Sequence, residues 1–289
     1  MEVIKSVNLL KERTEQIRQS GRQIGFVPTM GYLHEGHQAL MENARKANDV
    51  LVVSIFVNPL QFGQGEDFDT YPRDEQRDKQ LAEDHKVDIL FLPDVEEMYP
   101  NKPVIEMKVA CRVDVLCGRS RNGHFDGVVT VLTKLFHLVQ PHRVYFGLKD
   151  AQQAAVVDAL VKDLNFPLEV VPVSTVREED GLAKSSRNVY LSKEERLEAK
   201  EIYQALQLGR QLVIDGEKNP DTVVKEVEDF INKHTHGKID YVEMLTFPEL
   251  TTFDLVTGQV ILAVAVQFEK ARLIDNVIFD QNGHISERL

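Results

Sequence analysis

The sequence predicts an α/β protein in which a doubly wound parallel sheet is followed by a smaller C-terminal α+β domain. Up to about residue 176, apolar runs of strand length alternate with helical patterns, as in βαβ units. The run 50–57, VLVVSIFV, is continuously apolar, which is typical of a strand buried on both faces of a parallel sheet. After residue 176, charged amphipathic patterns precede three apolar runs. We therefore expect domains at residues 1–176 and 177–289.

The individual elements follow from local periodicity and from the glycines and prolines that interrupt it. In the first domain, strands are expected at 23–27, 50–57, 88–92, 143–146 and 168–173. Helices are expected between them at 6–19, 38–47, 74–85, 128–139 and 151–164, with an irregular, partly basic stretch at 100–123. In the second domain, we expect helices at 193–214 and 220–234, then strands at 240–245, 259–268 and 272–279.

The composition is that of an ordinary soluble globular protein, with 43% hydrophobic and 28% charged residues. A net charge of -12 argues against a general binder of nucleic acid or of anionic membranes, because both need a basic face. Charged residues interrupt the apolar ones at the N-terminus, and no apolar run approaches the roughly 18 residues of a membrane span. Cys111 and Cys117, the two cysteines, can form neither a disulfide framework nor a four-cysteine zinc site. We expect a reduced, cytoplasmic protein.

The stretch 28–37, PTMGYLHEGH, joins an expected strand to an expected helix through a glycine-containing turn. Free backbone N–H groups and the positive end of the dipole make a helix start an anion site, and phosphate is its usual ligand. His34 and His37 would act there as cations or donors. The sequence is not a metalloprotease H-E-x-x-H helix, because Gln38 stands where the second histidine is needed. An ordinary βα loop with polar surface histidines is the alternative.

Three further polar segments follow expected strands, at Asn58, at 147–150 and from Val176 onward. In an open parallel sheet, such segments can meet in one cleft at the carboxyl ends of the strands. Lys149 offers a cation, and Asp150 offers a carboxylate for a ribose hydroxyl, a magnesium ion or the N-cap of the next helix. The stretch 184–187, KSSR, carries two charges and two hydroxyls suited to a triphosphate, although it could also be a solvated surface loop.

Small carboxylic acids could bind to four amide or cationic side chains that no sequence rule selects from their neighbours. These side chains are Asn58, Gln61, Arg121 and Gln153.

With its H-x-G-H and K-S-S-R loops in this order, the chain resembles the nucleotidyltransferase superfamily related to class I aminoacyl-tRNA synthetases. The blocks PTMGYLHEGH, SIFVNPLQF, YPR, HFDGVVTV, YFGLKDAQQ and TVREEDGLAKSSRN sharpen the resemblance to the pantothenate synthetase family, the pantoate-β-alanine ligases. They extend over the first domain and the start of the second. The resemblance implies a Rossmann-like domain, a smaller C-terminal lid domain, a homodimer, and ATP with Mg²⁺.

The resemblance also implies roles for residues that match the motifs. ATP would contact Met30, Gly31, Tyr32, Leu33, His34, Glu35, Gly36, His37, Gly147, Leu148, Lys149, Asp150, Val176, Lys184, Ser185, Ser186 and Arg187. Pantoate would bind Gln61 and Gln153, while Asn58, Gln61, Tyr71 and Arg121 would lie near the second substrate. Many relatives carry methionine at the position of Lys184, so this lysine either adds a phosphate contact or contributes only its backbone.

The implied reaction has two steps. Pantoate attacks the α-phosphorus of ATP and expels pyrophosphate, and the amine of β-alanine then attacks the acyl adenylate and expels AMP. His34, His37 and Lys149 would be the catalytic residues, with His37 as the candidate proton donor and Asp150 as the candidate magnesium ligand. The alternatives are a nucleotidyltransferase that stops at the nucleotidylated product, and a nucleotide sensor that binds ATP without turnover.

Overall fold

The computed structural model describes residues 1–63, 66 and 68–289. The chain divides into two compact units. The first comprises residues 1–110, 121–147 and 156–173, and the second comprises 111–120, 148–155 and 174–289. The second unit thus takes in two short segments from the range expected for the first domain. The domain boundary near residue 176 stays a prediction.

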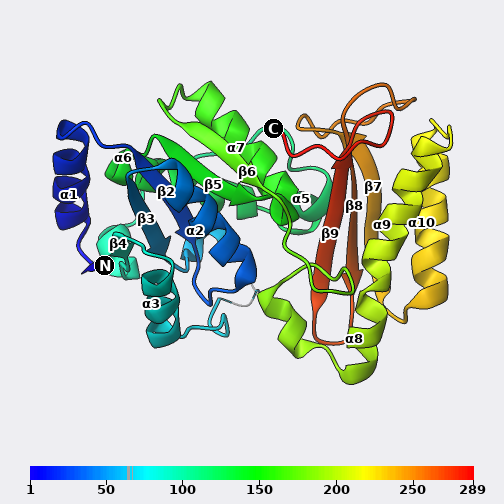
Figure 1. Cartoon of the computed structure of the whole chain (residues 1–289), viewed down its shortest axis with the longest axis horizontal. Coiled ribbons are helices and arrows are strands. Elements are labelled where there is room, and N and C mark those ends of the chain that lie inside the picture. The colour runs from blue at the N-terminus through cyan, green and yellow to red at the C-terminus, as the bar shows by residue number, and fades with distance from the viewer. Residues whose placement is uncertain (64–65, 67) are drawn as a thin grey trace. The chain divides into compact units, whose positions relative to one another are not determined.

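The first unit is built on a six-stranded parallel sheet with the strand order β1-β4-β3-β2-β5-β6 (Figure 1). The strands are β1 (Glu2–Ile4), β2 (Ile24–Thr29), β3 (Val50–Ile55), β4 (Ile89–Phe91), β5 (Arg143–Gly147) and β6 (Glu169–Val173). Together with the antiparallel sheet of the second unit, this confirms the predicted fold class. The edge strand β1 was not predicted, because three residues are too few to show a period.

The strand order reverses at β2, where the chain returns from β4 to place β5 on the other side. The two strands pair only at Gly25 with Arg143 and at Phe26 with Val144. Beyond these pairs, β2 and β5 each continue for three more residues, to Thr29 and Gly147, without pairing with each other. Ligands of open α/β sheets bind at the carboxyl ends of the strands at such a reversal.

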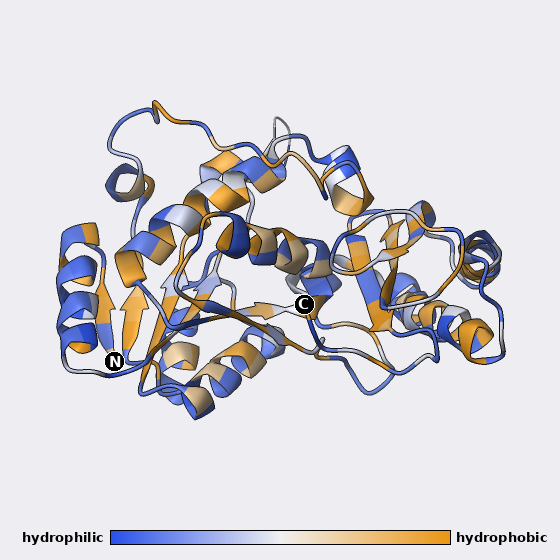
Figure 2. Ribbon diagram, turned by 90° about the horizontal axis from the view of Figure 1, so that it is seen from above, coloured by the Kyte–Doolittle hydropathy of each residue, from blue (hydrophilic) through white to orange (hydrophobic). Residues whose placement is uncertain are grey.

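Helices lie on both faces of this sheet, and their hydrophobic residues turn toward the strands (Figure 2). The helical segments of the first unit are α1 (Val7–Gln19), α2 (Glu35–Ala47), η1 (Pro59–Gln61), α3 (Glu75–Asp84), α4 (Val95–Met98), α6 (His124–Val139) and most of α7 (Ala151–Asp163), while α5 (Leu116–Ser120), η2 (Leu148–Asp150) and the start of α7 belong to the second unit. Met41 of α2 and Ala82 of α3 pack with alternate strand residues such as Val53. α6 begins four residues earlier than expected, directly after Gly123, whose φ is 78°. Within the described ranges, no helix is long and apolar enough to cross a membrane.

The second unit contains a three-stranded antiparallel sheet with β8 in the centre. Its other elements are η3 (Ser186–Tyr190), α8 (Lys193–Ala199), α9 (Glu201–Ile214), α10 (Pro220–His234), β7 (Lys238–Thr246), β8 (Val260–Gln267) and β9 (Arg272–Phe279). Leu206 of α9 and Val227 of α10 pack against Leu262 in the core. The single helix expected at 193–214 was wrong, because it is interrupted at Lys200. That residue keeps right-handed helical dihedrals, so the break lies in the hydrogen bonding.

His142, just before β5, generates a prediction about pH. Its Nδ1 accepts a hydrogen bond from the Ile24 N–H at 3.0 Å. Burial, and then the charges of Arg18 and Arg143, lower the pKa of this imidazole, while Asp49 opposes them. The fold therefore favours the neutral ring. Its contribution to the free energy of unfolding is present above the unfolded pKa of about 6.5 and is lost as the pH falls through the lower folded value.

We expect His142→Asn to flatten this part of the pH dependence. The amide oxygen can accept from Ile24 but does not titrate. The measurement is denaturant unfolding of both proteins between about pH 5 and 8, where histidines titrate. His236, whose pKa is raised by Glu198, acts in the opposite direction but is common to both proteins. Equal pH slopes would contradict the role of His142.

Candidate active site

The loop after β2 adopts an unusual backbone before α2 begins. Gly31 has a φ of 89° and Tyr32 a φ of 50°, so two successive residues are left-handed. A Cβ on Gly31 would lie 2.8 Å from Cγ2 of Ile55 and 3.1 Å from a carboxylate oxygen of Asp78. Both the dihedral angle and the available space therefore require glycine at this position.

Asp78 of α3 holds this loop in place. Its two carboxylate oxygens accept hydrogen bonds from the backbone N–H groups of Tyr32 at 2.8 Å and Leu33 at 2.7 Å. Burial raises the pKa of Asp78, although the two backbone bonds partly offset that effect. Asp78 was missed in the sequence, but a signal was present. It lies four residues before the buried Ala82, on the buried face of α3.

His34 and His37 use the same ring atom to cap α2. Nδ1 of His34 accepts from the Gly36 N–H at 3.1 Å, and Nδ1 of His37 accepts from the His34 N–H at 3.2 Å. A neutral ring that accepts at Nδ1 carries its proton on Nε2, so each ring has an Nε2–H donor. The ring centroids lie 4.2 Å apart at the positive end of the helix dipole. The helix start therefore has the features that the sequence led us to expect, and anion binding by it stays a prediction.

Gly36 has a steric role in this motif. A Cβ at this position would lie 2.8 Å from Cε1 of His34. The glycine therefore leaves room for the His34 ring to fold over the start of the helix.

Asn58, which directly precedes η1, is fixed by four hydrogen bonds. Its Oδ1 accepts from the Tyr99 hydroxyl at 3.0 Å and from the Leu60 N–H at 3.3 Å. Its Nδ2 donates to Oε1 of Gln61 at 3.3 Å and to the Gly127 carbonyl at 3.1 Å. Burial raises the pKa of Tyr99 to about 12, so its hydroxyl remains a donor at neutral pH. Tyr99 was not singled out from the sequence, where its short segment showed no period.

The Asn58 contact orients the neighbouring Gln61 amide. Because Oε1 of Gln61 accepts from Asn58, its Nε2 points the other way, toward Sδ of Met30 at 3.2 Å. Met30 belongs to the loop that leads to the two histidines. The expected substrate residues Asn58 and Gln61 are thus brought together beside the expected ATP residue Met30. Gln61 is 6% exposed, so its amide is largely shielded from water.

Arg121 belongs to the same group through His124. Its Nη1 donates to Nε2 of His124 at 3.0 Å, and Nδ1 of His124 donates to the Gln61 carbonyl at 2.8 Å. The other side of the guanidinium grips both carboxylate oxygens of Glu66, at 2.9 and 2.7 Å, and hydrogen bonding to Arg121 lowers the pKa of Glu66. The guanidinium of Arg121 is therefore held by His124 on one side and by a two-pronged contact with Glu66 on the other.

Tyr71 packs edge-on against Phe62, with ring centroids 6.0 Å apart. Residues 64, 65 and 67, between Phe62 and Tyr71, lie outside the described part of the chain.

The second unit brings Lys149 and Ser185 to the walls of one cavity of about 10 Å³, which is room for a single water. Ser185 also caps η3, because its Oγ accepts from the Arg187 N–H at 3.2 Å. The Lys184 N–H donates to the Val176 carbonyl at 2.9 Å, which closes a hairpin before the K-S-S-R stretch. The expected pantoate residue Gln153 is half-buried in α7, in the segment of the second unit that follows Lys149.

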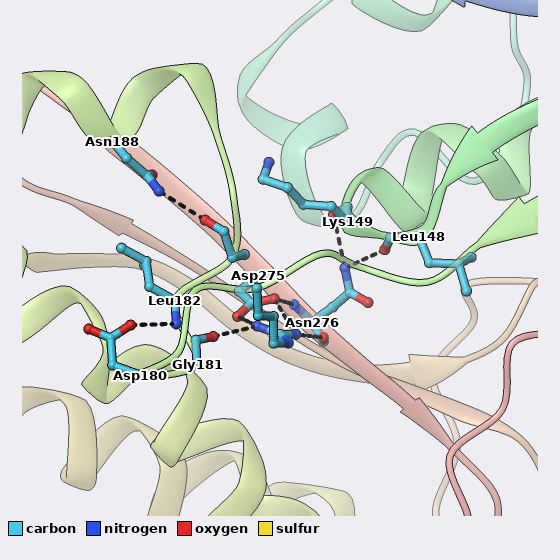
Figure 3. A network of polar contacts seen from close by, with 10 residues as sticks. Leu148, Lys149, Asp180, Gly181, Leu182, Asn188, Asp275 and Asn276 are labelled. Atoms are coloured by element: carbon cyan, nitrogen blue, oxygen red, sulfur yellow. Dashed lines mark hydrogen bonds and ion pairs between the residues drawn. The ribbon is translucent and has the colours of Figure 1, made fainter. Parts of the chain in front are cut away.

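A polar network that was not predicted connects these two loops to β9 (Figure 3). Asp275 forms a two-pronged ion pair with Arg177 at 2.6 and 2.9 Å. Asn276 donates to the carbonyls of Leu148 at 2.9 Å and Lys149 at 3.0 Å. The available signal was the pair of adjacent polar residues in a strand that is otherwise apolar after Arg272.

Metal-ligating side chains do not cluster in groups of three or more anywhere in the described ranges. Asp150 offers a carboxylate next to Lys149, with Nζ of the lysine 3.9 Å from its Oδ1. A magnesium ion held mainly by phosphate oxygens and water needs only one or two protein carboxylates, so Asp150 fits that kind of site.

Known proteins resemble this chain over nearly its whole length. The pantoate-β-alanine ligase family profile matches residues 2–278. A pantothenate synthetase of Geobacillus sp. (strain WCH70) is 57% identical over 280 residues, covering 97% of this chain and 99% of the relative. The crystal structure of pantothenate synthetase from Thermus thermophilus has a TM-score of 0.89 and 46% identity, covering 96% of this chain and 99% of that one. The structure of a pantoate-β-alanine ligase from Francisella tularensis, complexed with β-γ ATP and β-alanine, has a TM-score of 0.78 and 32% identity, covering 97% and 98% of the two chains. The chain therefore belongs to the pantoate-β-alanine ligase family.

Proposed function

We propose that this chain condenses pantoate with β-alanine in an ATP-dependent reaction that passes through a pantoyl adenylate. The observation that carries the proposal is the paired use of Nδ1 by His34 and His37. It places the ring proton on Nε2 of each histidine, at a helix start of the kind that binds phosphate. Family membership and the ATP and β-alanine of the Francisella relative support the choice of substrates.

In the first step, the pantoate carboxylate attacks the α-phosphorus of ATP, and pyrophosphate leaves. The protein contributes little covalent chemistry to such a displacement, so catalysis rests on positioning and charge stabilisation. We propose that the Nε2–H groups of His34 and His37 bind phosphate oxygens, and that Lys149 balances the charge that develops there. The other phosphate contacts would come from Ser185, Ser186, Arg187 and Lys184.

Pantoate would be held by the oriented Nε2 of Gln61 and by Gln153. In the second step, the amine of β-alanine attacks the acyl carbonyl, and AMP departs. Arg121 would bind the carboxylate of β-alanine by exchanging it for the carboxylate of Glu66, which its guanidinium holds with two hydrogen bonds. Asn58 and Tyr71 would line the same part of the site.

Three further features complete the proposal. Asp150 would share a Mg²⁺ ion with the phosphates, and the ion would supply charge neutralisation there. The enzyme would act as a homodimer. It would work in the cytoplasm, as its cysteine content led us to expect.

The direct test is incubation with ATP, Mg²⁺, pantoate and β-alanine, followed by assay of AMP, pyrophosphate and pantothenate. We expect all three products in equal amounts. Pyrophosphate without AMP after adding the amine would instead support a nucleotidyltransferase that stops at the nucleotidylated acid. ATP binding without either product would support the sensor. Turnover of another acid in place of pantoate would overturn the substrate assignment.

His37 and Lys149 should be needed for the first half-reaction. We expect His37→Asn and Lys149→Ala to lower pantoate-dependent pyrophosphate release by on the order of 10²–10³, as loss of a single oxyanion donor does. The amide oxygen introduced by His37→Asn can still accept from the His34 N–H, so this variant removes the Nε2–H while preserving the cap. His137→Ala and Lys233→Ala, at exposed positions, are the matched controls. Near-normal pyrophosphate release by either variant would contradict the role assigned to the substituted residue.

Asp78 should affect the rate of the same half-reaction, because it holds the loop that contains Tyr32 and Leu33. In Asp78→Asn, the amide NH₂ would face one of the two backbone N–H groups, so one hydrogen bond is lost and the loop shifts. We expect pyrophosphate release to slow by at least about tenfold, because small displacements of catalytic groups are costly. Asp84→Asn, at the exposed end of α3, is the control. An unchanged rate in the folded variant would show that the carboxylate is not needed.

A further inference from the structure

β9 is the edge strand of the antiparallel sheet, and it carries two adjacent polar residues that are both buried. Asp275 is 5% and Asn276 is 7% exposed. Successive strand residues point to opposite faces. Asp275 shares its face with the core residues Leu273 and Val277, so the Asn276 side chain points the other way. A buried polar pair in an apolar strand is costly unless every group has a partner.

The Asn276 side chain donates both of its amide N–H groups to the backbone around Lys149. Nδ2 donates to the Leu148 carbonyl at 2.9 Å and to the Lys149 carbonyl at 3.0 Å (Figure 3). Two donors from one rigid amide to successive carbonyls fix both the position and the rotation of that peptide. The peptide lies in η2, which leads directly into α7. The Lys149 side chain begins from this fixed backbone.

Asn276 is itself anchored on both sides of its own backbone. Its N–H donates to Oδ1 of Asp275 at 2.8 Å, and its carbonyl accepts from Nη2 of Arg177 at 3.3 Å. Arg177 also donates to the Gly181 carbonyl at 3.0 Å, and its guanidinium lies 3.8 Å from the centre of the Tyr203 ring. The donor that holds Lys149 is therefore part of a rigid network.

We propose that Asn276 is a positioning residue that sets the place of the Lys149 ammonium during adenylate formation. The proposal rests on the function proposed above, in which Lys149 balances phosphate charge. It does not require Asn276 to touch a substrate. Lys149 and Ser185 line the same cavity as Asp275, so the network around Asn276 reaches both phosphate-binding loops of the second unit.

A double-mutant cycle separates positioning from a general structural role. The variants are Asn276→Leu, which keeps the approximate shape without donors, and Lys149→Met, which removes the ammonium. We expect Asn276→Leu alone to slow pantoate-dependent pyrophosphate release by about 10- to 100-fold. In the Lys149→Met background, the same change should cost less than about twofold, because the group that it positions is gone. An equal loss in both backgrounds would overturn the proposal.

Control variants distinguish a failure of the role proposed for Asn276 from a failure of the proposed function. Asn232→Leu makes the same change on the exposed face of α10 and should leave the rate unaltered. If Asn276→Leu does not fold, Asn276→Ser keeps one donor and enters the same cycle, with a smaller loss that again disappears in Lys149→Met. A wild-type enzyme that releases no pyrophosphate with pantoate would instead refute the proposed function. An active wild type with an additive cycle would refute only the role of Asn276.

Discussion

A loop that leaves the carboxyl end of a buried strand carries backbone N–H and C=O groups that must find partners away from water. In this protein, a buried polar side chain from another part of the chain meets that need for two loops of the candidate site. Asp78 accepts the N–H groups of Tyr32 and Leu33, and Asn276 donates to the carbonyls of Leu148 and Lys149. Asn58 similarly joins η1 to α6. The requirement that stabilises the fold therefore also fixes the loops in single conformations.

Such fixed loops suit a reaction that depends on electrostatics. The displacement at phosphorus needs donors and cations aimed at charge as it develops, and they are most effective when they do not reorganise during the step. The Tyr99 hydroxyl, Asn58 and Gln61 show how far this order extends. Each contact fixes the next amide, so the Nε2 of Gln61 is oriented by a phenol two contacts away. The low exposure of these amides strengthens their hydrogen bonds and makes unpaired alternatives costly.

The parts of the fold that depend on local periodicity could be predicted from the sequence. The β-branched run at 50–57 and the helical spacing of 128–139 led to the correct elements and the correct fold class. The motif residues of the first loop were also found, because chain order places them together. The partners Asp78, Tyr99 and Asn276 were not found. Each acts on a loop 40 or more residues away, and a pattern read along the chain indicates that a residue is buried without showing what it touches.

The spacing of His-x-Gly-His follows from this geometry more than from charge. A histidine at the N-cap can accept the Gly36 N–H with one nitrogen and keep a donor on the other, which lysine and arginine cannot do because they have no acceptor. The second histidine lies three residues later, on the same side of the first turn, and accepts the N–H of the first. Glycine between them leaves room for the first ring. The motif therefore stabilises the helix start through Nδ1 and directs two donors through Nε2 of the same two rings. This would couple the local folding of α2 to the proposed phosphate contacts.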